Sequence, residues 1–408
     1  MEETILGFTP EALAKTQATF TATEIAQQPD AWVEALATVH GQATELQYFL
    51  ERHLTPESQI ILTGAGTSAF VGRTIKPFLM QHTPCPVLEV ATTDLVSNPH
   101  EYFGKDRPTL LVSFARSGNS PESNAAIELA NQCLSQVGHL IITCNPEGKL
   151  ALTGKKQSHS YVILMPECTN DQSFAMTSSY TSMMIAALTA FNLQHQKVLE
   201  QLYAVPKLTA KVLERLNVQA KELVETKASR LVYLGSGGFL GLAQEAALKV
   251  LELTAGKLMA TYDSPLGFRH GPKSLVNEET VIIEFLSNDN YTKLYDQDLA
   301  AELVSNDIAK RVVTLGTGDL TPFYQDKGLV SEEAGKVVLG KGKTEVVALS
   351  VPEFAQASDL QLIFPYIVFA QAFALHSSLA YGITPDNPCP TGEVNRVVQG
   401  VNIYPLAK

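Results

Sequence analysis

Short runs of apolar, β-branched residues recur along the chain and are separated by segments of helical periodicity roughly 20 to 30 residues long. The runs are apolar at every position, which is typical of strands that are buried on both faces of a parallel sheet. The pattern therefore predicts an α/β fold built from βαβ units. In such open sheets, ligands bind at the carboxyl ends of the strands.

The apolar pattern occurs twice. Gly64 of "ILTGAGTSAFVG" matches Gly235 of "VYLGSGGFLG", and further runs repeat at the same constant offset along the chain. The matched runs are 61–72 with 232–241, 109–114 with 280–285, 140–143 with 311–314 and, after an insertion in the second copy, 162–167 with 347–353. This repeat predicts a duplicated domain. The expected divisions are a helical arm at 1–45, domains at 46–215 and 216–388, and a tail at 389–408 that contributes to the active site.

Two helical segments stand out by their polarity. Residues 207–229 have the amphipathic spacing of a bridging helix. Residues 360–384 carry no formal charge. They are divided into apolar runs shorter than the ~18 residues of a membrane span by Gln361, Pro365, Gln371 and His376. We interpret this segment as a buried core helix and expect residues 364–379 to supply an apolar surface for a symmetric interface.

Charge and cysteine usage exclude several classes of protein. A formal net charge of -12 argues against nucleic-acid binding, which needs clustered Lys and Arg. The five cysteines are odd in number and show no CxxC pair, so neither a zinc site nor a disulfide framework is indicated. The acidic N-terminus lacks the order of a signal peptide. We expect a cytoplasmic enzyme without a metal ion and without membrane attachment.

Two turns rich in hydroxyl groups follow strands of the first copy. Thr67 and Ser68 lie in "GAGTSA", and Arg116, Ser117 and Ser120 lie in "LLVSFARSGNSPES". The backbone N–H groups and dipole of a following helix attract anions, and these side chains add donors. Helix capping alone explains either turn. Two such turns at one sheet edge favour a phosphate site.

Residues 64–69 also match the G-x-G-x-x-A fingerprint of dinucleotide binding, and Glu89 ends the next strand, where a ribose-binding acid is expected. Against this interpretation, Leu240 occupies the third position of the fingerprint in the second copy. A dehydrogenase also does not account for the SGNS turn. NAD binding is an alternative, but we expect the protein to have no cofactor.

Acid–base candidates lie in the second copy, in "QEAALKVLELTAGKLMATYDSPLGFRHGPKS". Glu245, Lys249 and Glu252 have the spacing i, i+4 and i+7, which places them on one stripe of a helix. A solvated, ion-paired face is the alternative explanation. The following turn-rich loop contains Arg269 and His270, and a histidine beside a carboxylate-bearing helix offers an acid and a base near neutral pH.

These motifs resemble the sugar isomerase (SIS) domain family. The "GAGTS" and "SFARSGNS" loops are similar to SIS loops, and the long second-copy segment together with "TGEVNRVVQGV" resembles the AgaS-type galactosamine-6-phosphate deaminase/isomerases. The resemblance covers nearly all of residues 45–408. It implies two tandem SIS domains, each a five-stranded parallel sheet flanked by helices on both faces.

The resemblance also implies roles for individual residues, by comparison with the isomerase half of glucosamine-6-phosphate synthase. Glu252 would shuttle the proton and His270 would open the sugar ring. Lys249 would stabilise oxyanion charge or simply pair with Glu245. The segment "FAMTSSYT" would contact the sugar. The expected substrate- or phosphate-binding residues are Thr67, Ser68, Ala115, Arg116, Ser117, Ser120, Thr177, Arg269 and Gln399.

The tail departs from the synthase, which has a lysine near the position of Val398, so Arg396 and Gln399 are the candidates to replace it. The implied reaction converts D-galactosamine 6-phosphate to D-tagatose 6-phosphate and ammonia through an enolamine, without a metal ion. Plain aldose–ketose isomerisation, glucosamine-6-phosphate deamination and a sugar-phosphate sensor are alternatives. The expected partners are a small-molecule sugar phosphate and further copies of the chain, in a homodimer or homotetramer with shared active sites.

Overall fold

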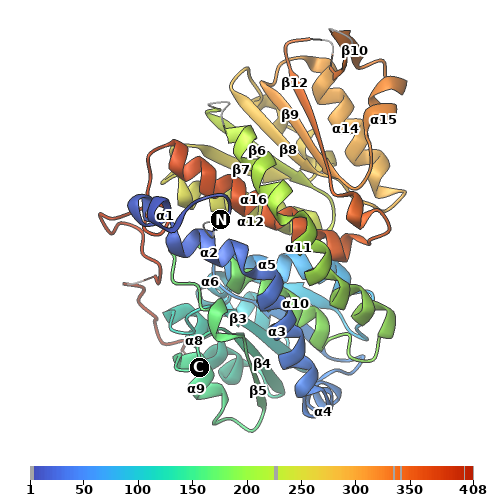
Figure 1. Cartoon of the computed structure of the whole chain (residues 1–408). Helices are drawn as coiled ribbons and strands as arrows, with labels where there is room; N and C mark the ends of the chain where they lie inside the picture. Colours follow the sequence, from blue (N-terminus) through green and yellow to red (C-terminus); the bar gives the residue numbers. More distant parts are fainter. Residues whose placement is uncertain (1–3, 225–227, 334–335, 341, 399, 408) are drawn as a thin grey trace. The chain divides into compact units, whose positions relative to one another are not determined.

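The contacts divide the chain into two compact units, each built around a five-stranded parallel sheet (Figure 1). Unit 1 comprises Met1–Ala22 and Lys207–Pro388, and unit 2 comprises Thr23–Pro206 and Cys389–Lys408. The computed structural model describes residues 4–224, 228–333, 336–340, 342–398 and 400–407. The domain boundaries expected near residues 45, 215 and 388 stay a prediction.

The sheet of unit 2 has the strand order β2-β1-β3-β4-β5, with all neighbours parallel. Its strands are β1 (Gln59–Thr63), β2 (Val87–Glu89), β3 (Thr109–Ala115), β4 (Val137–Thr143) and β5 (Ser160–Leu164). Every residue of β1 and β3 is buried. Helices cover both faces of the sheet, which explains why the central strands are apolar throughout.

One face of this sheet carries α3 (Gln28–Gly41), α4 (Ala43–His53), α5 (Thr67–Leu79) and α10 (Ser178–Ala190). The other face carries α6 (Thr92–Ser97), α7 (Pro99–Phe103), α8 (Pro121–Cys133) and α9 (Lys149–Gly154), which enclose a core around Ile61, Leu111 and Ile141. Trp32 of α3 is fully buried, and its Nε1–H donates to Thr181 Oγ1 at 2.8 Å. The helix α3 is therefore packed into the fold.

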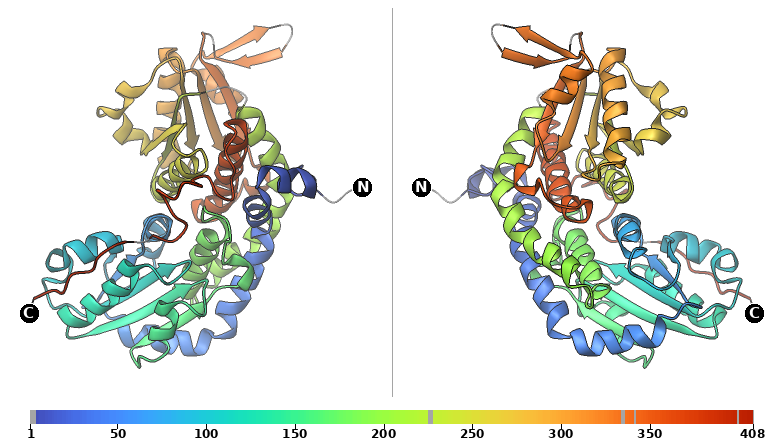
Figure 2. Two further views of the ribbon diagram at one scale, coloured as in Figure 1. Left: turned by 90° about the vertical axis from the view of Figure 1, so that its left-hand side faces the viewer. Right: turned by 90° about the vertical axis from the view of Figure 1, so that its right-hand side faces the viewer.

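The sheet of unit 1 repeats this topology. Its order is β12-β9-β8-β6-β7, which matches unit 2 strand for strand when the copies are aligned at the repeat. The strands are β6 (Arg230–Gly235), β7 (Met259–Asp263), β8 (Thr280–Phe285), β9 (Arg311–Gly316) and β12 (Glu345–Ser350). An antiparallel hairpin of β10 (Val330–Glu333) and β11 (Lys336–Leu339) lies between β9 and β12 in the sequence, within the segment where the insertion is expected (Figure 2).

Helices also cover the sheet of unit 1. They are α12 (Gly238–Leu253) and α16 (Asp359–Ala380), which pack against each other, and α13 (Pro265–Phe268), α14 (Thr292–Asn306) and α15 (Thr321–Asp326). The other described helices are α1 (Pro10–Thr16), α2 (Thr19–Ala26) and α11 (Gln196–Val224). α11 begins at Gln196 rather than Lys207, because Leu199, Leu202 and Val205 continue its buried stripe and the helix runs through Pro206.

The helix α16 is long and apolar enough to cross a membrane, but 94% of its most apolar window is buried inside the protein. The prediction of a buried core helix is confirmed. The prediction that residues 364–379 supply an interface surface is wrong, because the side chains from Leu360 to Ser378 are already buried within the single chain. The segment 360–384 therefore lacks formal charge because α16 lies in the core.

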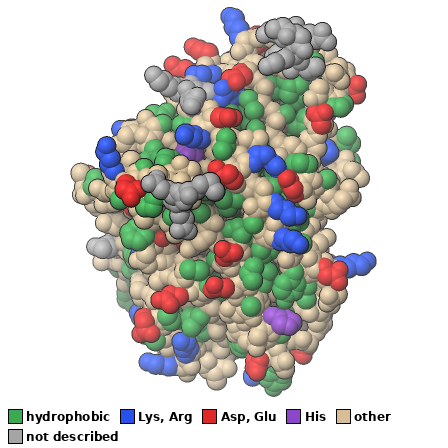
Figure 3. Space-filling view, in the orientation of Figure 1, with side chains coloured by type: hydrophobic (Ala, Val, Ile, Leu, Met, Phe, Trp, Pro, Cys, Tyr) green, Lys and Arg blue, Asp and Glu red, His purple; other side chains and the backbone are tan. Residues whose placement is uncertain are grey.

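The surface fits the acidic composition. On the face shown in Figure 3, acidic and basic side chains are interspersed among polar and apolar ones and the described residues form no extended basic band. The chain has 42 acidic and 30 basic residues, so this mixed surface follows its composition.

Candidate active site

Two turns of unit 2 lie side by side at the carboxyl edge of its sheet. β1 and β3 are paired neighbours, so the turns that lead from them into α5 and α8 share that edge. Both turns require glycine. Gly118 has φ +64°, and a Cβ on Gly64 would lie 2.5 Å from the backbone carbon of Ser68. The tight turns bring the first N–H groups of each helix to the sheet edge.

The hydroxyl groups of the second turn are arranged around its backbone. Ser117 Oγ accepts the N–H of Asn119 at 3.2 Å, and Ser120 Oγ lies 2.6 Å from Ser123 Oγ. Among the described residues, the backbone N–H groups of Ser117 and Gly118 have no hydrogen-bond partner. The turn thus presents backbone and hydroxyl donors together, as an anion site requires.

The corresponding turn of unit 1 is bound to carboxylates of the protein itself. The Ser287 N–H donates to Asp296 Oδ2 at 2.9 Å, and the Asn288 N–H donates to Asp359 Oδ1 at 2.7 Å. The Ser287 hydroxyl donates to Asp359 Oδ2 at 2.6 Å, and the Ser236 hydroxyl donates to Asp296 Oδ1 at 2.5 Å. Two carboxylates therefore accept hydrogen bonds from this strand end.

The constant offset of the repeat relates the two turns position by position. Ser287 corresponds to Arg116 and Asn288 to Ser117. In unit 1 the backbone N–H groups at these positions are bound by anionic oxygens. Because both turns follow equivalent strands of the same topology, the N–H groups of unit 2 are suited to bind an anionic oxygen as well.

The side chain of Arg116 connects this turn to two other segments. It is 6% exposed, and its Nη1 donates to the carbonyl oxygens of Ser173 at 3.2 Å and Phe174 at 3.1 Å. Its Nη2 donates to the carbonyl oxygen of Arg396 at 2.7 Å. These donors are committed to the backbone, so the guanidinium positions the neighbouring segments around the turn.

The C-terminal tail lies along unit 2, beside α8 (Figure 2). The Nε of Arg396 donates to the carbonyl oxygens of Asp171 at 3.1 Å and Ser173 at 3.2 Å, and its Nη2 also donates to Asp171. Further along, the side chain of Gln132 donates to the Leu406 carbonyl oxygen at 3.0 Å. Arg396 is thus a tail residue next to the turns, whereas Gln399 lies outside the described residues.

The segment that contains Thr177 is held by two buried carboxylates. Asp171 accepts the N–H groups of Thr177 at 2.8 Å and Ser179 at 2.9 Å. Glu24 accepts the Ser173 N–H at 3.1 Å and the Ser173 hydroxyl. Burial, followed by the charge of Asp171, raises the pKa of Glu24 to about 7. These contacts fix the segment beside the turns.

The first turn also touches this segment, because Ser68 Oγ lies 3.8 Å from Met176 Sδ. Thr67 and Ser68 are both buried. The structure therefore brings Thr67, Ser68, Arg116 and the Thr177 segment together at one edge of the unit 2 sheet, with Ser117 and Ser120 on the neighbouring turn.

The acid–base candidates lie on α12 of unit 1. Lys249 is fully buried, and its Nζ lies 3.3 Å from Glu245 Oε1 and also forms an ion pair with Glu252. Burial lowers the pKa of Lys249, but the attraction of Glu245 and Glu252 outweighs this effect, and the net shift is upward. The stripe is therefore not a solvated face. Lys249 remains a buried cation, and the side chain of Glu252, 23% exposed, is the member that reaches solvent.

The loop after β7 carries His270 and Arg269. The His270 side chain is exposed, and its backbone N–H donates to the Gly267 carbonyl oxygen at 2.9 Å. Arg269 Nη2 forms an ion pair with Glu302 Oε2 at 2.9 Å. His270 is accessible to a ligand in solution, while Arg269 already has an anionic partner inside unit 1.

A tandem pair of five-stranded parallel sheets with hydroxyl-rich strand-end turns defines a protein of the sugar isomerase class, and the SIS domain model matches residues 53–193. The chain is 44% identical over 402 residues to the D-galactosamine-6-phosphate deaminase AgaS of Escherichia coli O157:H7, covering 98% of each protein. It is 40% identical over 411 residues to the protein of that name from Shewanella sp. (strain ANA-3), covering 100% of this chain and 97% of the relative. The chain belongs to the AgaS family.

Solved structures agree with this assignment. The tagatose-6-phosphate ketose/aldose isomerase from Escherichia coli superimposes with a TM-score of 0.83 at 41% identity, covering 98% of this chain and 99% of that chain. The C-terminal domain of glucosamine-fructose-6-phosphate aminotransferase from Francisella tularensis shares the fold, with a TM-score of 0.69 at 17% identity and coverage of 90% and 98%. The SIS resemblance and the tandem SIS fold are confirmed.

Four carboxylates at the two sheet edges were not predicted from the sequence: Glu24, Asp171, Asp296 and Asp359. Glu24 lies in the segment interpreted as an arm, and Asp359 begins a helix that drew attention for its apolar run. No signal in the sequence indicated Asp296, because the burial that makes this acid need hydrogen-bond donors is visible only in the structure.

Proposed function

We propose that this chain is an amino sugar phosphate deaminase that converts D-galactosamine 6-phosphate and water to D-tagatose 6-phosphate and ammonia. The observation that carries the proposal is the identity of 40–44% over nearly the full length to proteins named D-galactosamine-6-phosphate deaminase AgaS. The chemistry of the described residues is compatible with each part of this reaction.

The phosphate is assigned to the two turns of unit 2. Ser117 and Ser120 supply hydroxyl donors and the turn supplies backbone N–H groups. The carboxylates that Asp296 and Asp359 place on the matching N–H groups of unit 1 support this assignment. Thr67 and Ser68 at the neighbouring turn, Thr177 on the adjoining segment, and Arg269 and Gln399 complete the proposed substrate-binding set.

The proton transfer is assigned to Glu252. In the open-chain form of the sugar, the proton at C2 moves to C1 through an enolamine. This transfer reduces C1 and oxidises C2 to an imine. Water then adds at C2, the C–N bond breaks and ammonia leaves. Lys249 stays charged beside Glu252 and would stabilise the developing oxyanion, and His270 would assist ring opening.

A second candidate function is plain aldose–ketose isomerisation of a hexose 6-phosphate. The observation in its favour is the similarity to the structure of the tagatose-6-phosphate ketose/aldose isomerase from E. coli. It uses the same base but needs no hydrolysis of an imine. Sequence motifs also do not distinguish a substrate with the galacto configuration at C4 from one with the gluco configuration.

The deciding experiment measures ammonia and ketose phosphate from the purified chain with three substrates. Galactosamine 6-phosphate should yield both products in equal amounts, and glucosamine 6-phosphate should react much more slowly. Galactose 6-phosphate is the substrate for plain isomerisation. Ketose formation from it, without ammonia release from either amino sugar, would replace the deaminase proposal with the isomerase. Absence of turnover with all three would favour a sensor.

We further propose that the enzyme works in the cytoplasm as a homo-oligomer in which neighbouring chains share active sites. The free cysteines support a reducing compartment. The proposal of shared sites comes from the resemblance to the synthase, in which the ring-opening histidine reaches the site from the neighbouring subunit.

A further inference from the structure

Unit 2 has a polar cavity at the edge of the sheet opposite to the proposed phosphate turns. Its volume is about 590 Å³, and Thr109 and Val137, where β3 and β4 begin, lie in its wall. The turn at Ser117 follows the other end of β3. The lining residues are Arg52, His53, Thr55, Pro108, Thr109, Asn131, Leu134, Ser135, Gln136, Val137 and His159.

The charge of the lining is opposite to that of the chain. Arg52, His53 and His159 line the cavity, and no Asp or Glu is among the described lining residues. Acidic residues outnumber Lys and Arg by 42 to 30 in the whole chain, so this lining is a local departure from the composition. A concave surface with one sign of charge concentrates ligands of the opposite sign.

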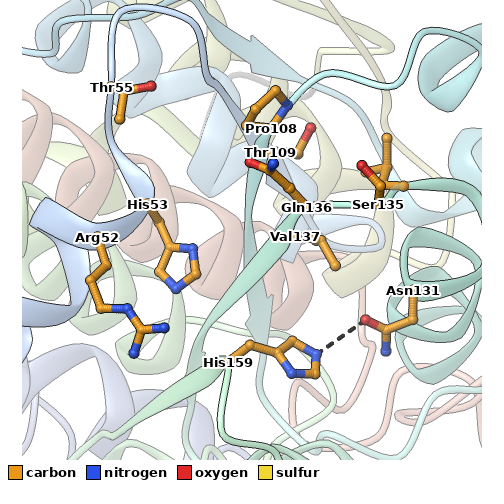
Figure 4. A pocket seen from close by; sticks show the side chains of 11 residues that line it. Arg52, His53, Thr55, Pro108, Thr109, Asn131, Ser135, Gln136, Val137 and His159 are labelled. Atoms are coloured by element: carbon orange, nitrogen blue, oxygen red, sulfur yellow. Dashed lines mark hydrogen bonds between the residues drawn. The ribbon is translucent and has the colours of Figure 1, made fainter.

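The imidazoles are held in place before any ligand binds. Asn131 Oδ1 lies 2.9 Å from His139 Nε2 and 3.2 Å from His159 Nε2, so one amide fixes both rings. Figure 4 shows the contact with His159. His139 is fully buried behind the lining. The ring of His53 lies against Gly138, where a Cβ would come within 2.5 Å of His53 Nδ1. The cavity is therefore shaped around these rings.

The basic groups disfavour one another's protonated forms, and Arg52 is the permanent cation among them. Burial and then the charges of Arg52 and His159 lower the pKa of His53. Burial, His159 and His53 lower the pKa of His139 to about 3. An anion among these groups would offset their mutual repulsion. Figure 4 shows Arg52 and His53 next to each other, and His159 below them with its ring directed at Asn131.

We propose that this cavity binds a small oxyanion, the phosphate or carboxylate group of a metabolite, at a site separate from the strand-end turns. Arg52 supplies the charge-assisted hydrogen bonds, and His53, His159 and the amide of Asn131 supply further donors. The cavity is large enough for a molecule that carries several carbon atoms in addition to the anionic group.

The test is a titration of the full chain, with ¹³C-labelled histidine, followed by NMR. The resonances are assigned with His53→Gln and His159→Gln, and the probes are inorganic phosphate and succinate. At least one probe should shift the His53 and His159 resonances saturably. Arg52→Ala should weaken that binding about tenfold, as the loss of a charge-assisted hydrogen bond predicts. Lys105→Ala, which removes an exposed cation outside the cavity, should leave it unchanged.

Saturation by phosphate alone would identify a phosphate-bearing ligand, and saturation by succinate alone would identify a carboxylate; both results support the proposal. Resonances that do not move with either probe would overturn it. Equal weakening by Lys105→Ala would also overturn it, because the attraction would then be diffuse. Melting temperatures confirm folding, and Arg52→Gln replaces Arg52→Ala if the alanine variant is unstable.

Discussion

The Arg116 guanidinium donates a hydrogen bond of 2.7 Å to the carbonyl oxygen of Arg396, a residue 280 positions later in the chain. Arg396 in turn donates to the carbonyl oxygens of Asp171 and Ser173, and Arg116 also binds the Ser173 carbonyl. The two arginines hold one backbone segment between them. The tail is thereby attached to unit 2 next to the proposed phosphate turns.

Loss of the Arg116 side chain should therefore release the tail. Arg116→Ala leaves three carbonyl oxygens without this donor, which should lower the free energy of unfolding by about 1–3 kcal/mol. Hydrogen–deuterium exchange of residues 389–398 should become faster. Arg107→Ala is the matched control, because Arg107 donates to the Glu57 carbonyl oxygen and not to the tail. Exchange in the tail that stays at the wild-type rate would refute the attachment.

The hydroxyl groups of the second turn should matter for phosphorylated ligands. Ser117→Ala combined with Ser120→Ala should raise the KM for the sugar phosphate about 30-fold, because each of the two lost hydrogen bonds is worth roughly 1 kcal/mol or more. Inorganic phosphate should inhibit the double variant less than the wild type. Ser97→Ala, at an exposed hydroxyl bound to its own helix, is the control. An unchanged KM would reduce the turn to a helix cap.

The carboxylate of Glu252 should be essential for turnover. Glu252→Gln keeps the size of the side chain but cannot accept the C2 proton, so kcat should fall by roughly 10²-fold or more while substrate binding persists. The partner residue behaves differently: Lys249→Met leaves two carboxylates facing each other and should lower stability by about 3–5 kcal/mol. Near-normal turnover of Glu252→Gln would eliminate this residue as the base.

Stability should depend on pH through Glu24. Its pKa is raised from 4.5 to about 7, so the folded chain favours the protonated form, and ionisation costs stability as the pH rises from about 4.5 to 7. Glu24→Gln should therefore gain about 1–3 kcal/mol relative to wild type between pH 5 and pH 8. Thermal melts at both pH values measure this. Glu34→Gln, an exposed acid on α3, serves as control, and a parallel shift for both variants would contradict the assignment.

Shared active sites should show complementation. Glu252→Gln and His270→Ala should each be nearly inactive, but a mixed dimer would contain one site with both wild-type residues. With random pairing, half of the dimers are mixed and each has one good site of two, so activity should recover to roughly a quarter of wild type. Inactive dimers that are demonstrably mixed would place both residues in the site of one chain.

The sheets could be predicted because their strands are buried on both faces. That burial leaves uninterrupted apolar runs such as 109–114 and 280–285, and the repeat that relates these runs then predicts the same strand order for both sheets. The turn residues could be predicted for a related reason, since Gly64 and Gly118 occupy positions where a side chain does not fit or the backbone is left-handed.

Long-range polar contacts could not be predicted in this way. The binding of Arg396 to Asp171 joins positions 225 residues apart, and no local periodicity records it. The same holds for Asp359, which accepts from Asn288 across 71 residues. The helix α16 shows a second limit of prediction from the sequence. An uncharged helix has the same residue pattern whether its side chains are buried by the same chain or by a partner chain.

The carboxylates on the turn of unit 1 have a consequence for stoichiometry. Asp296 and Asp359 are tethered to the chain, and a tethered group has an effective local concentration in the millimolar range or above. Dissolved sugar phosphate must displace them to bind there, whereas in unit 2 no carboxylate of the described residues accepts a hydrogen bond from the N–H groups of Ser117 and Gly118. A chain with two copies of the fold should therefore hold the phosphate group of its substrate at the strand-end turns of one copy only.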